Sequence, residues 1–223
     1  MKKKIDCKKN VEIGTKYLEQ EIKKSNVKAM EVYGYLLLEG KRIQKNETKG
    51  MELLNFAINK YKSINAKFLL AKYIISQVNY FDDDNDKINY VLAKKYAKEA
   101  ADDGNTKGMI LYGLLCHKRI TNKYGKIEQN FAETFKYFKM AADLDDPDGI
   151  AYYSYYLSLP HGLFTPEIKK SVELSKIAHE KGSGFGSYLY AFNVLEGICV
   201  PKNLKEGWKL VKIAEERGEI RAL

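Results

Sequence analysis

Charged and apolar segments alternate along the 223-residue chain, and two interleaved patterns recur in them. In the first pattern, an alanine that follows lysine or methionine is followed by a polar stretch and usually by glycine. The copies are KEAADDG at 98–104, KMAADLD at 139–145, KIAHEKG at 176–182 and KIAEERG at 212–218. Gly104, Gly182 and Gly218 fit the residue after a helix, where a positive φ closes the last turn. The pattern therefore predicts recurrent helix ends.

A small residue lies eleven positions before each of these ends, and the same spacing recovers two more positions upstream. The six positions are Gly14, Gly50, Ala93, Thr134, Ser171 and Gly207, which are 36, 43, 41, 37 and 36 residues apart. Self-similarity at this period is typical of repeat proteins built from one supersecondary unit.

The second pattern lies between copies of the first, at 29–40, 66–77, 108–119, 149–160 and 186–197. Each segment opens with a small residue and has another five places on, directly after a bulky one. The bulky–small pairs are Tyr33–Gly34, Leu70–Ala71, Tyr112–Gly113, Tyr153–Ser154 and Tyr190–Ala191. Small residues let two helix backbones approach closely. Since glycine inside a helix costs about 1 kcal/mol against alanine, its recurrence in register indicates packing.

These patterns predict an all-α fold in which helix A, a loop and helix B repeat. Such pairs cannot bury their apolar faces alone, so they stack into a right-handed α–α superhelix, an α-solenoid of tandem helix-turn-helix repeats. We expect one solenoid over 1–223, with a half repeat at 10–25 and the start of a sixth repeat at 219–223. The full repeats are expected at 26–63, 64–104, 105–145, 146–182 and 183–218. The sixth ends abruptly, so the C-terminus is expected to belong to a longer parent or to be covered by a partner.

The best copies, ADDGNTKGMILYGLL (101–115), AMEVYGYLLLEG (29–40) and AKKYAKEAADDG (93–104), resemble the Sel-one-like repeat family. That family is related to the tetratricopeptide repeat, and the resemblance covers the chain from about residue 10 onward. It implies an adaptor that assembles protein complexes. The chain departs from the pattern in its fourth repeat, where LSLPHGLFTP replaces the usual glycine-containing polar loop.

In repeats of this type the A helices line a concave face that can hold a peptide. If the small residue of each A helix packs against helix B, the groove-facing positions are expected three before, one after and four after it. The candidates are Glu31, Tyr35, Leu38, Phe68, Lys72, Ile75, Ile110, Leu114, His117, Ala151, Tyr155, Ser158, Tyr188, Phe192 and Leu195. We expect Tyr35, Tyr155 and Phe192 to contact a protein or peptide partner. The alternative is that some candidates pack between adjacent A helices and leave a narrower groove.

The net charge of +9 suggests a second hypothesis, a basic module that binds an acidic partner, nucleic acid or an anionic membrane. Much of the excess lies near the N-terminus, at Lys2, Lys3, Lys4, Lys8 and Lys9. Further along, lysines alternate with acids, as on ordinary solvated helix faces, which disfavours specific nucleic-acid binding. Salt separates the hypotheses, because electrostatic binding weakens steeply between low and physiological salt.

No chemical motif predicts an enzyme, a metal site or a cofactor. FDDDNDK at 81–87 alternates carboxylates as a calcium loop does, but Lys87 and Ala93 replace its glycine and glutamate, so we expect a solvated loop. GSGFG at 182–186 has neither the strand before it nor the lysine after it that a phosphate loop needs. The three histidines, His117, His161 and His179, lie in different repeats.

The cysteines and the N-terminus predict an intracellular, cytoplasmic protein. Cys7, Cys116 and Cys199 are odd in number and widely spaced, so they predict no disulfide framework and no zinc site. Cys116 is expected in the core, on the packing face of its helix. No apolar run is long enough to span a bilayer, and MKKKIDCKKNVEIG has no apolar region typical of a secretory signal.

Overall fold

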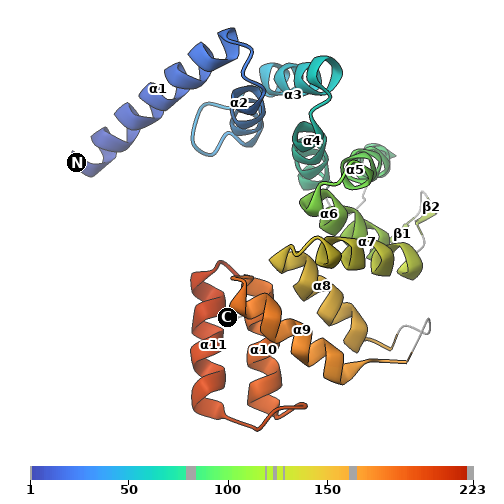
Figure 1. The fold of residues 1–223 in the computed structure, drawn as a ribbon. Helices are drawn as coiled ribbons and strands as arrows, with labels where there is room; N and C mark the ends of the chain where they lie inside the picture. The colour runs from blue at the N-terminus through green and yellow to red at the C-terminus, as the bar shows by residue number, and fades with distance from the viewer. Residues whose placement is uncertain are drawn as a thin grey trace. The chain divides into compact units, whose positions relative to one another are not determined.

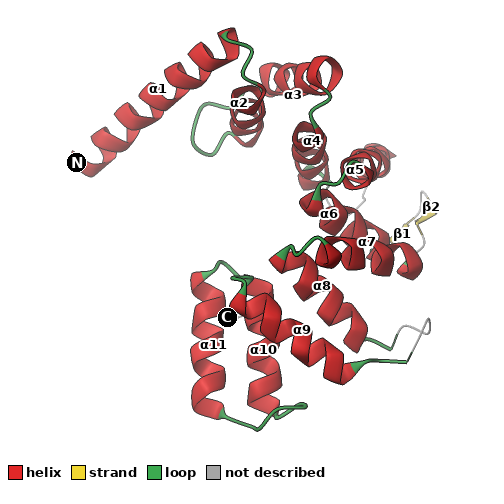
Figure 2. Ribbon diagram, in the orientation of Figure 1, coloured by secondary structure: helices red, strands yellow, loops and turns green. Residues whose placement is uncertain are grey.

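The computed structural model describes residues 2–78, 84–118, 120–122, 125–127, 129–160 and 165–219. Within these ranges it has eleven helices and one small β-hairpin (Figures 1 and 2). The helices are α1 Lys2–Lys23, α2 Val27–Glu39, α3 Glu47–Tyr61, α4 Ile64–Ser76, α5 Asp84–Asp102, α6 Thr106–His117, α7 Phe131–Asp143, α8 Pro147–Ser158, α9 Ile168–Glu180, α10 Gly184–Glu196 and α11 Leu204–Glu216. The strands are β1 Ile120–Asn122 and β2 Gly125–Ile127.

After α1 the helices form consecutive pairs in which helix A packs against the helix B that follows it. The A helices are α2, α4, α6, α8 and α10, and the B helices are α3, α5, α7, α9 and α11. The chain folds into two compact units, an N-terminal unit, Met1–Asn105, and a C-terminal unit, Thr106–Leu223. The first contains α1 to α5, and the second contains α6 to α11 and the hairpin.

Side-chain caps explain why many of the helices begin where they do. In seven helices the residue before the first turn accepts a hydrogen bond from a backbone N–H of that turn, which satisfies one of the donors that a helix start leaves open. The capping residues are Asn26, Asn46, Ser63, Asn130, Asp146, Ser183 and Asn203.

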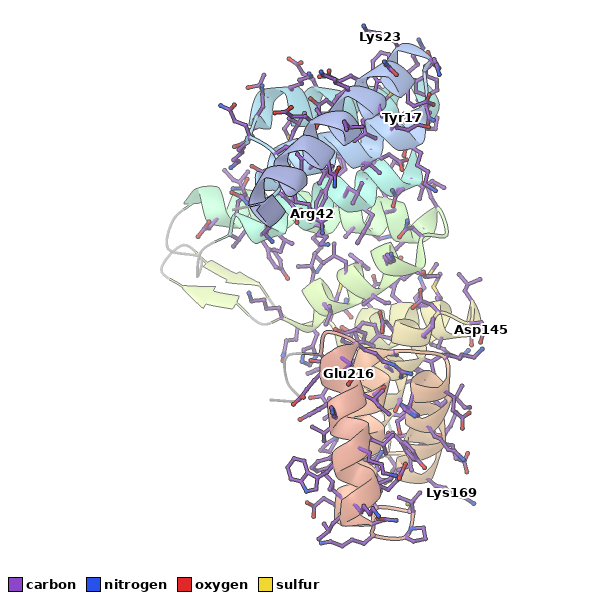
Figure 3. The ribbon with its side chains drawn as sticks, turned by 90° about the vertical axis from the view of Figure 1, so that its left-hand side faces the viewer. Tyr17, Lys23, Arg42, Asp145, Lys169 and Glu216 are labelled. Atoms are coloured by element: carbon purple, nitrogen blue, oxygen red, sulfur yellow. The ribbon has the colours of Figure 1, made fainter. Side chains whose placement is uncertain are left out.

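The turn after each B helix contains one residue in the left-handed region. Gly104, Gly182 and Gly218 have φ of 93°, 97° and 85°, which confirms the conformation predicted for these glycines. Ser25, Lys62 and Asp145 (labelled in Figure 3) have the same conformation in the remaining turns, with φ of 64°, 55° and 62°. The same sharp turn therefore joins one helix pair to the next whether or not glycine is present.

Within a pair, helices A and B approach closely at the small residues of the two patterns. A Cβ atom on Gly50 of α3 would lie 2.8 Å from the carbonyl oxygen of Gly34 in α2. In α8 and α9 the equivalent residues are hydrogen-bonded, since Ser154 Oγ donates to the Ser171 carbonyl oxygen at 2.8 Å. The close approach predicted from the small residues is confirmed at these contacts.

Consecutive pairs are joined by a second small-residue contact. A Cβ atom on Gly149, which opens the second pattern in α8, would lie 2.6 Å from Ala141 Cβ in α7. A Cβ atom on Gly186 of α10 would lie 2.5 Å from Ala178 Cβ and 2.9 Å from the Ala178 carbonyl carbon in α9. The alanine of the first pattern thus packs against the opening residue of the second.

Two of the connections between helix A and helix B differ from the simple repeat. Between α6 and α7 the A–B connection contains the β-hairpin, in which Ile120 pairs with Ile127, where the sequence predicts only a loop. In the fourth pair α8 ends at Ser158 and α9 begins at Ile168; the prolines of LSLPHGLFTP lie between them, and residues 161–164 are outside the described ranges. No helix in the described ranges is long and apolar enough to cross a membrane.

Candidate partner-binding surface

On the A helices of the C-terminal unit, the residue directly after the small one is exposed. One residue turns a helix by about 100°, so this position points away from helix B. In the C-terminal unit the three residues at this position are apolar and exposed: Leu114 by 38%, Tyr155 by 39% and Phe192 by 50%. They lie in the same register on α6, α8 and α10, and α8 packs against both of the other two. We call Leu114, Tyr155 and Phe192 the exposed stripe.

In the N-terminal unit the same position is occupied by Tyr35 and Lys72, which contact each other. The Lys72 ammonium lies 5.2 Å from the centre of the Tyr35 ring, over its face. Burial raises the pKa of Tyr35 to about 12, and the nearby Glu39 carboxylate acts in the same direction. The two side chains come from consecutive A helices, so this position brings neighbouring repeats together.

The positions four after the small residue pack against helix B instead of lining a groove, which corrects the predicted register. Leu38 is 1% exposed in the core of the N-terminal unit, with Cδ2 2.8 Å from where a Cβ on Gly50 would lie. Leu195 contacts α11 at Gly207 in the same way. The reason is that residues i and i+4 share one face of a helix. Leu38 is therefore unavailable to a partner.

The other three candidates at that position, Ile75, His117 and Ser158, are partly buried. Ile75 is partly buried against the core of the N-terminal unit. The ring of His117 lies edge-on to Phe131 and Tyr156, with centroid distances of 5.9 and 5.6 Å.

The positions three before the small residue face the neighbouring A helix. Glu31 is buried, and its carboxylate accepts hydrogen bonds from Ser63 Oγ at 2.5 Å and Asn65 Nδ2 at 2.8 Å, which ties α2 to the start of α4. Tyr188 packs against the core cluster that contains Ile150 of α8. Glu31 is therefore a structural residue that joins two repeats, as the narrower-groove alternative expects.

The remaining candidates at this position are buried to different degrees. Ile110 and Ala151 are buried, and Phe68 is partly buried. Of the three predicted positions, the one after the small residue is thus the one that presents exposed side chains on consecutive A helices.

An open groove in the N-terminal unit was not predicted from the sequence. It has a volume of about 1130 Å³ and lies between α1, α2, the loop after α2 and the start of α3. Val11, Tyr33, Leu37 and Ile43 give it an apolar part. Positive charge comes from Lys16, Lys45, Lys49 and Arg42, of which Arg42 is labelled in Figure 3. No sequence motif marks it, because the packing of consecutive helices and a loop brings its lining residues together.

The acidic, histidine and cysteine residues form no metal-binding cluster in the described part of the chain, where no group of three or more potential metal ligands is found. Helix α5 begins at Asp84 and Asp86 is buried, so the latter part of FDDDNDK is helical where a solvated loop was predicted; Asp82 lies outside the described residues. Cys116 is buried in the core as predicted, and Cys199 is exposed.

The basic N-terminal segment lies in the first part of α1. Lys2, Lys3, Lys4, Lys8 and Lys9 belong to this helix, but their side chains lie outside the described part of the chain. The N-terminal alternative therefore stays a hypothesis.

A histidine joins the last two helix pairs. His179 Nδ1 lies 3.0 Å from Ser187 Oγ, and Arg217 Nη1 donates to Ser187 Oγ and to the His179 carbonyl oxygen, each at 2.7 Å. Ser187 is fully buried, so this serine–histidine pair is closed to a substrate. Burial lowers the pKa of His179 below its ordinary value, and the Arg217 guanidinium lowers it further.

Because the pKa of His179 is lowered in the folded protein, we expect the protein to become less stable as the pH decreases in the weakly acidic range. The unfolded chain protonates His179 as the pH falls through about 6.5, whereas the folded protein does so only at lower pH. The unfolded state then binds more protons, so the free energy of unfolding decreases below about pH 6.5. Urea unfolding between about pH 5 and 8 should show a shallower decrease for His179→Gln than for the wild type. Equal slopes in the two proteins would contradict this assignment.

The fold is an α-solenoid of paired helices, and its exposed stripe consists of apolar side chains at the same position of three A helices. The family model of the Sel1 repeat matches residues 27–60, 66–105, 107–146 and 185–219, which is more than half of the chain. The chain therefore belongs to the Sel1 repeat family, which confirms the resemblance. Helices α8 and α9 lie between the last two matches and form a further helix pair that the family model does not mark.

Three solved bacterial proteins have a similar fold. A Sel1 repeat protein from Oxalobacter formigenes aligns over 88% of this chain and 73% of its own, with a TM-score of 0.67 and 19% identity. For c5321, a protective antigen of uropathogenic Escherichia coli strains with an SLR fold, the shares are 93% and 42%, with a TM-score of 0.65 and 19% identity. A putative Sel1 repeat protein from Klebsiella pneumoniae gives 93% and 95%, with a TM-score of 0.54 and 16% identity. At these identities the likeness concerns the fold. No curated protein sequence matches the chain.

Sel1 repeats generally serve as protein–protein interaction modules, and the repeat is a non-catalytic scaffold.

Proposed function

We propose that the protein is an adaptor whose exposed stripe, Leu114, Tyr155 and Phe192, binds an apolar segment of a protein partner. The observation that supports this proposal most directly is the register: three consecutive A helices expose an apolar side chain at the same position. Scattered apolar residues are normal on a protein surface, whereas an aligned set is typical of an interaction site.

The spacing of the helices restricts the sequence of the partner. Packed helix axes lie about 8–10 Å apart, and a polyproline-II segment advances about 3.1 Å per residue with three residues per turn. A partner in this conformation would therefore meet the stripe with an apolar side chain at about every third residue. Tyr155 and Phe192 offer rings for such contacts, and aromatic side chains dominate binding energy at many interfaces.

The test is to replace Leu114, Tyr155 and Phe192 together by alanine and to compare the proteins that are captured at physiological salt. Each truncation of a central contact costs about 1 kcal/mol or more, so the affinity for a stripe-dependent partner should fall about 100-fold. The matched control replaces Ile168, Ile177 and Leu204, three exposed apolar residues of the B helices, by alanine. It should keep the partners of the wild type.

Salt separates this proposal from binding through the basic N-terminus. A partner held by the stripe should stay bound when salt is raised, whereas one held by the lysines of α1 should be released. The proposal fails if the triple variant still captures every partner of the wild type while its denaturant midpoint equals that of the wild type.

A further inference from the structure

Helix α1 has the packing glycine of a B helix, but no described residue packs on α1 at that glycine, although α2 contacts α1 elsewhere. Gly14 lies 36 residues before Gly50, in the register of the first pattern. A Cβ atom on Gly50 would collide with α2, whereas one on Gly14 would meet nothing within 4 Å. The equivalent positions in α9 and α11 are also in contact with an A helix, at Ser154 of α8 and Leu195 of α10.

An uncovered glycine in the middle of a helix is unfavourable for the chain by itself. Glycine costs about 1 kcal/mol against alanine at such a position. In α3 this cost is offset by the close contact with α2, but in α1 no described residue provides an equivalent contact. A close approach by another helix is the physical role that glycine serves at this register elsewhere in the molecule.

The side chains around Gly14 continue the likeness to α3. Leu18 follows Gly14 by four residues, as Leu54 follows Gly50. Leu54 is fully buried beneath α2, whereas Leu18 is only partly buried. Tyr17, beside it on α1 and labelled in Figure 3, is 61% exposed.

Helix α2 exposes an apolar side chain at a position that is packed in α10. Val32, two residues before the small residue of α2, is 42% exposed. At the same position of α10, Leu189 packs against a core cluster that contains Ile150 and Ala151 of α8. In the C-terminal unit a single A helix, α8, thus packs against the following B helix and the following A helix together. We call Gly14, Tyr17, Leu18 and Val32 the N-terminal docking face.

We propose that the N-terminal docking face binds an amphipathic helix of another polypeptide, in the way that α8 packs against α9 and α10. The partner helix would have a small residue over Gly14 and leucine four residues later, as α2 has Gly34 and Leu38. This occupant follows from continuity with the A–B interface that the chain repeats. The open groove lies elsewhere on α1, since Gly14, Tyr17 and Leu18 are not among its lining residues.

A peptide with the sequence of residues 26–40, NVKAMEVYGYLLLEG, is a direct probe because it reproduces an A helix. Isolated helices of this length are marginal in water, so the peptide would carry a lactam bridge on the face that is exposed in α2, and its helicity would be verified by circular dichroism. We expect saturable binding of the fluorescently labelled peptide to the full chain, measured by anisotropy. Replacing the peptide's own glycine, equivalent to Gly34, by leucine should abolish it.

The variant Gly14→Leu tests the site. Leucine would fill the place of the partner backbone and weaken binding about tenfold or more. The variant should fold at least as well as the wild type, because nothing lies within 4 Å and leucine favours a helix. Phe192→Ala, in the exposed stripe, should leave peptide binding unchanged.

Two results would overturn the proposal. One is the absence of binding by the helical peptide up to about 1 mM, the range of the weakest specific complexes. The other is binding that Gly14→Leu leaves intact, whether Phe192→Ala abolishes it or not, because the peptide would then bind elsewhere.

Discussion

Replacing Gly186 by leucine is expected to destabilise the C-terminal unit by about 3 kcal/mol or more. A Cβ atom on Gly186 would lie 2.5 Å from Ala178 Cβ, 2.9 Å from the Ala178 carbonyl carbon and 2.9 Å from the His179 nitrogen. Two of these atoms belong to the backbone of α9, which cannot move aside as a flexible side chain can. Helix α10 would have to move away from α9, and the core cluster that Phe185 forms with Ile150 and Ala178 would open.

Urea unfolding of the full chain, followed by circular dichroism, measures the effect. The matched control is Gly14→Leu, the same substitution at a helical glycine with nothing within 4 Å. It should not lower the stability of the protein, because leucine is the better helix former. Equal stability of the two variants would mean that α9 and α10 do not approach as closely as the structure shows.

The second large effect is expected for Leu38→Ala, which should cost about 2–5 kcal/mol. Leu38 is buried beside Leu54 and Gly50, so its truncation removes apolar contacts and leaves a cavity between α2 and α3. Leu114→Ala makes the same chemical change at an exposed residue of α6 and should cost less than about 1 kcal/mol.

Denaturant midpoints of these two leucine variants therefore test the corrected register. A loss for Leu114→Ala as large as that for Leu38→Ala would argue that the two positions are equally buried. A small loss for Leu38→Ala would return this residue to the candidate surface.

The fold could be predicted because small residues recur at two fixed positions of the repeat. Glycine is unfavourable inside a helix, so its recurrence at fixed positions indicates contacts between helices. The structure places Gly34, Gly50, Gly149 and Gly186 in such contacts. The family model and the sequence agree on these repeats.

The candidate surface could be predicted only in part. At the position after the small residue, Leu114, Tyr155 and Phe192 are exposed, whereas Tyr35 is partly buried. The position four after the small residue was predicted wrongly as groove-facing, because it shares the face of the small residue itself. Binding by these residues stays a prediction.

Pairings between distant residues were beyond the sequence. Glu31 looks like a surface carboxylate until Ser63 and Asn65 are placed beside it. The pairing of β1 with β2 and the groove beside α1 are local features that the repeat pattern does not mark.

The contact between Ala178 and Gly186, and its counterpart between Ala141 and Gly149, has a consequence for how such a protein changes during evolution. Each joins two repeats through residues with almost no side chain. The backbone approach at such a junction depends on the two small residues, so a repeat that keeps both can make the same approach to another repeat that keeps them. Unequal recombination that duplicates or deletes a whole repeat would create a junction that already packs. Gene length is therefore expected to vary by whole repeats among close relatives, while the surfaces between the junctions diverge freely.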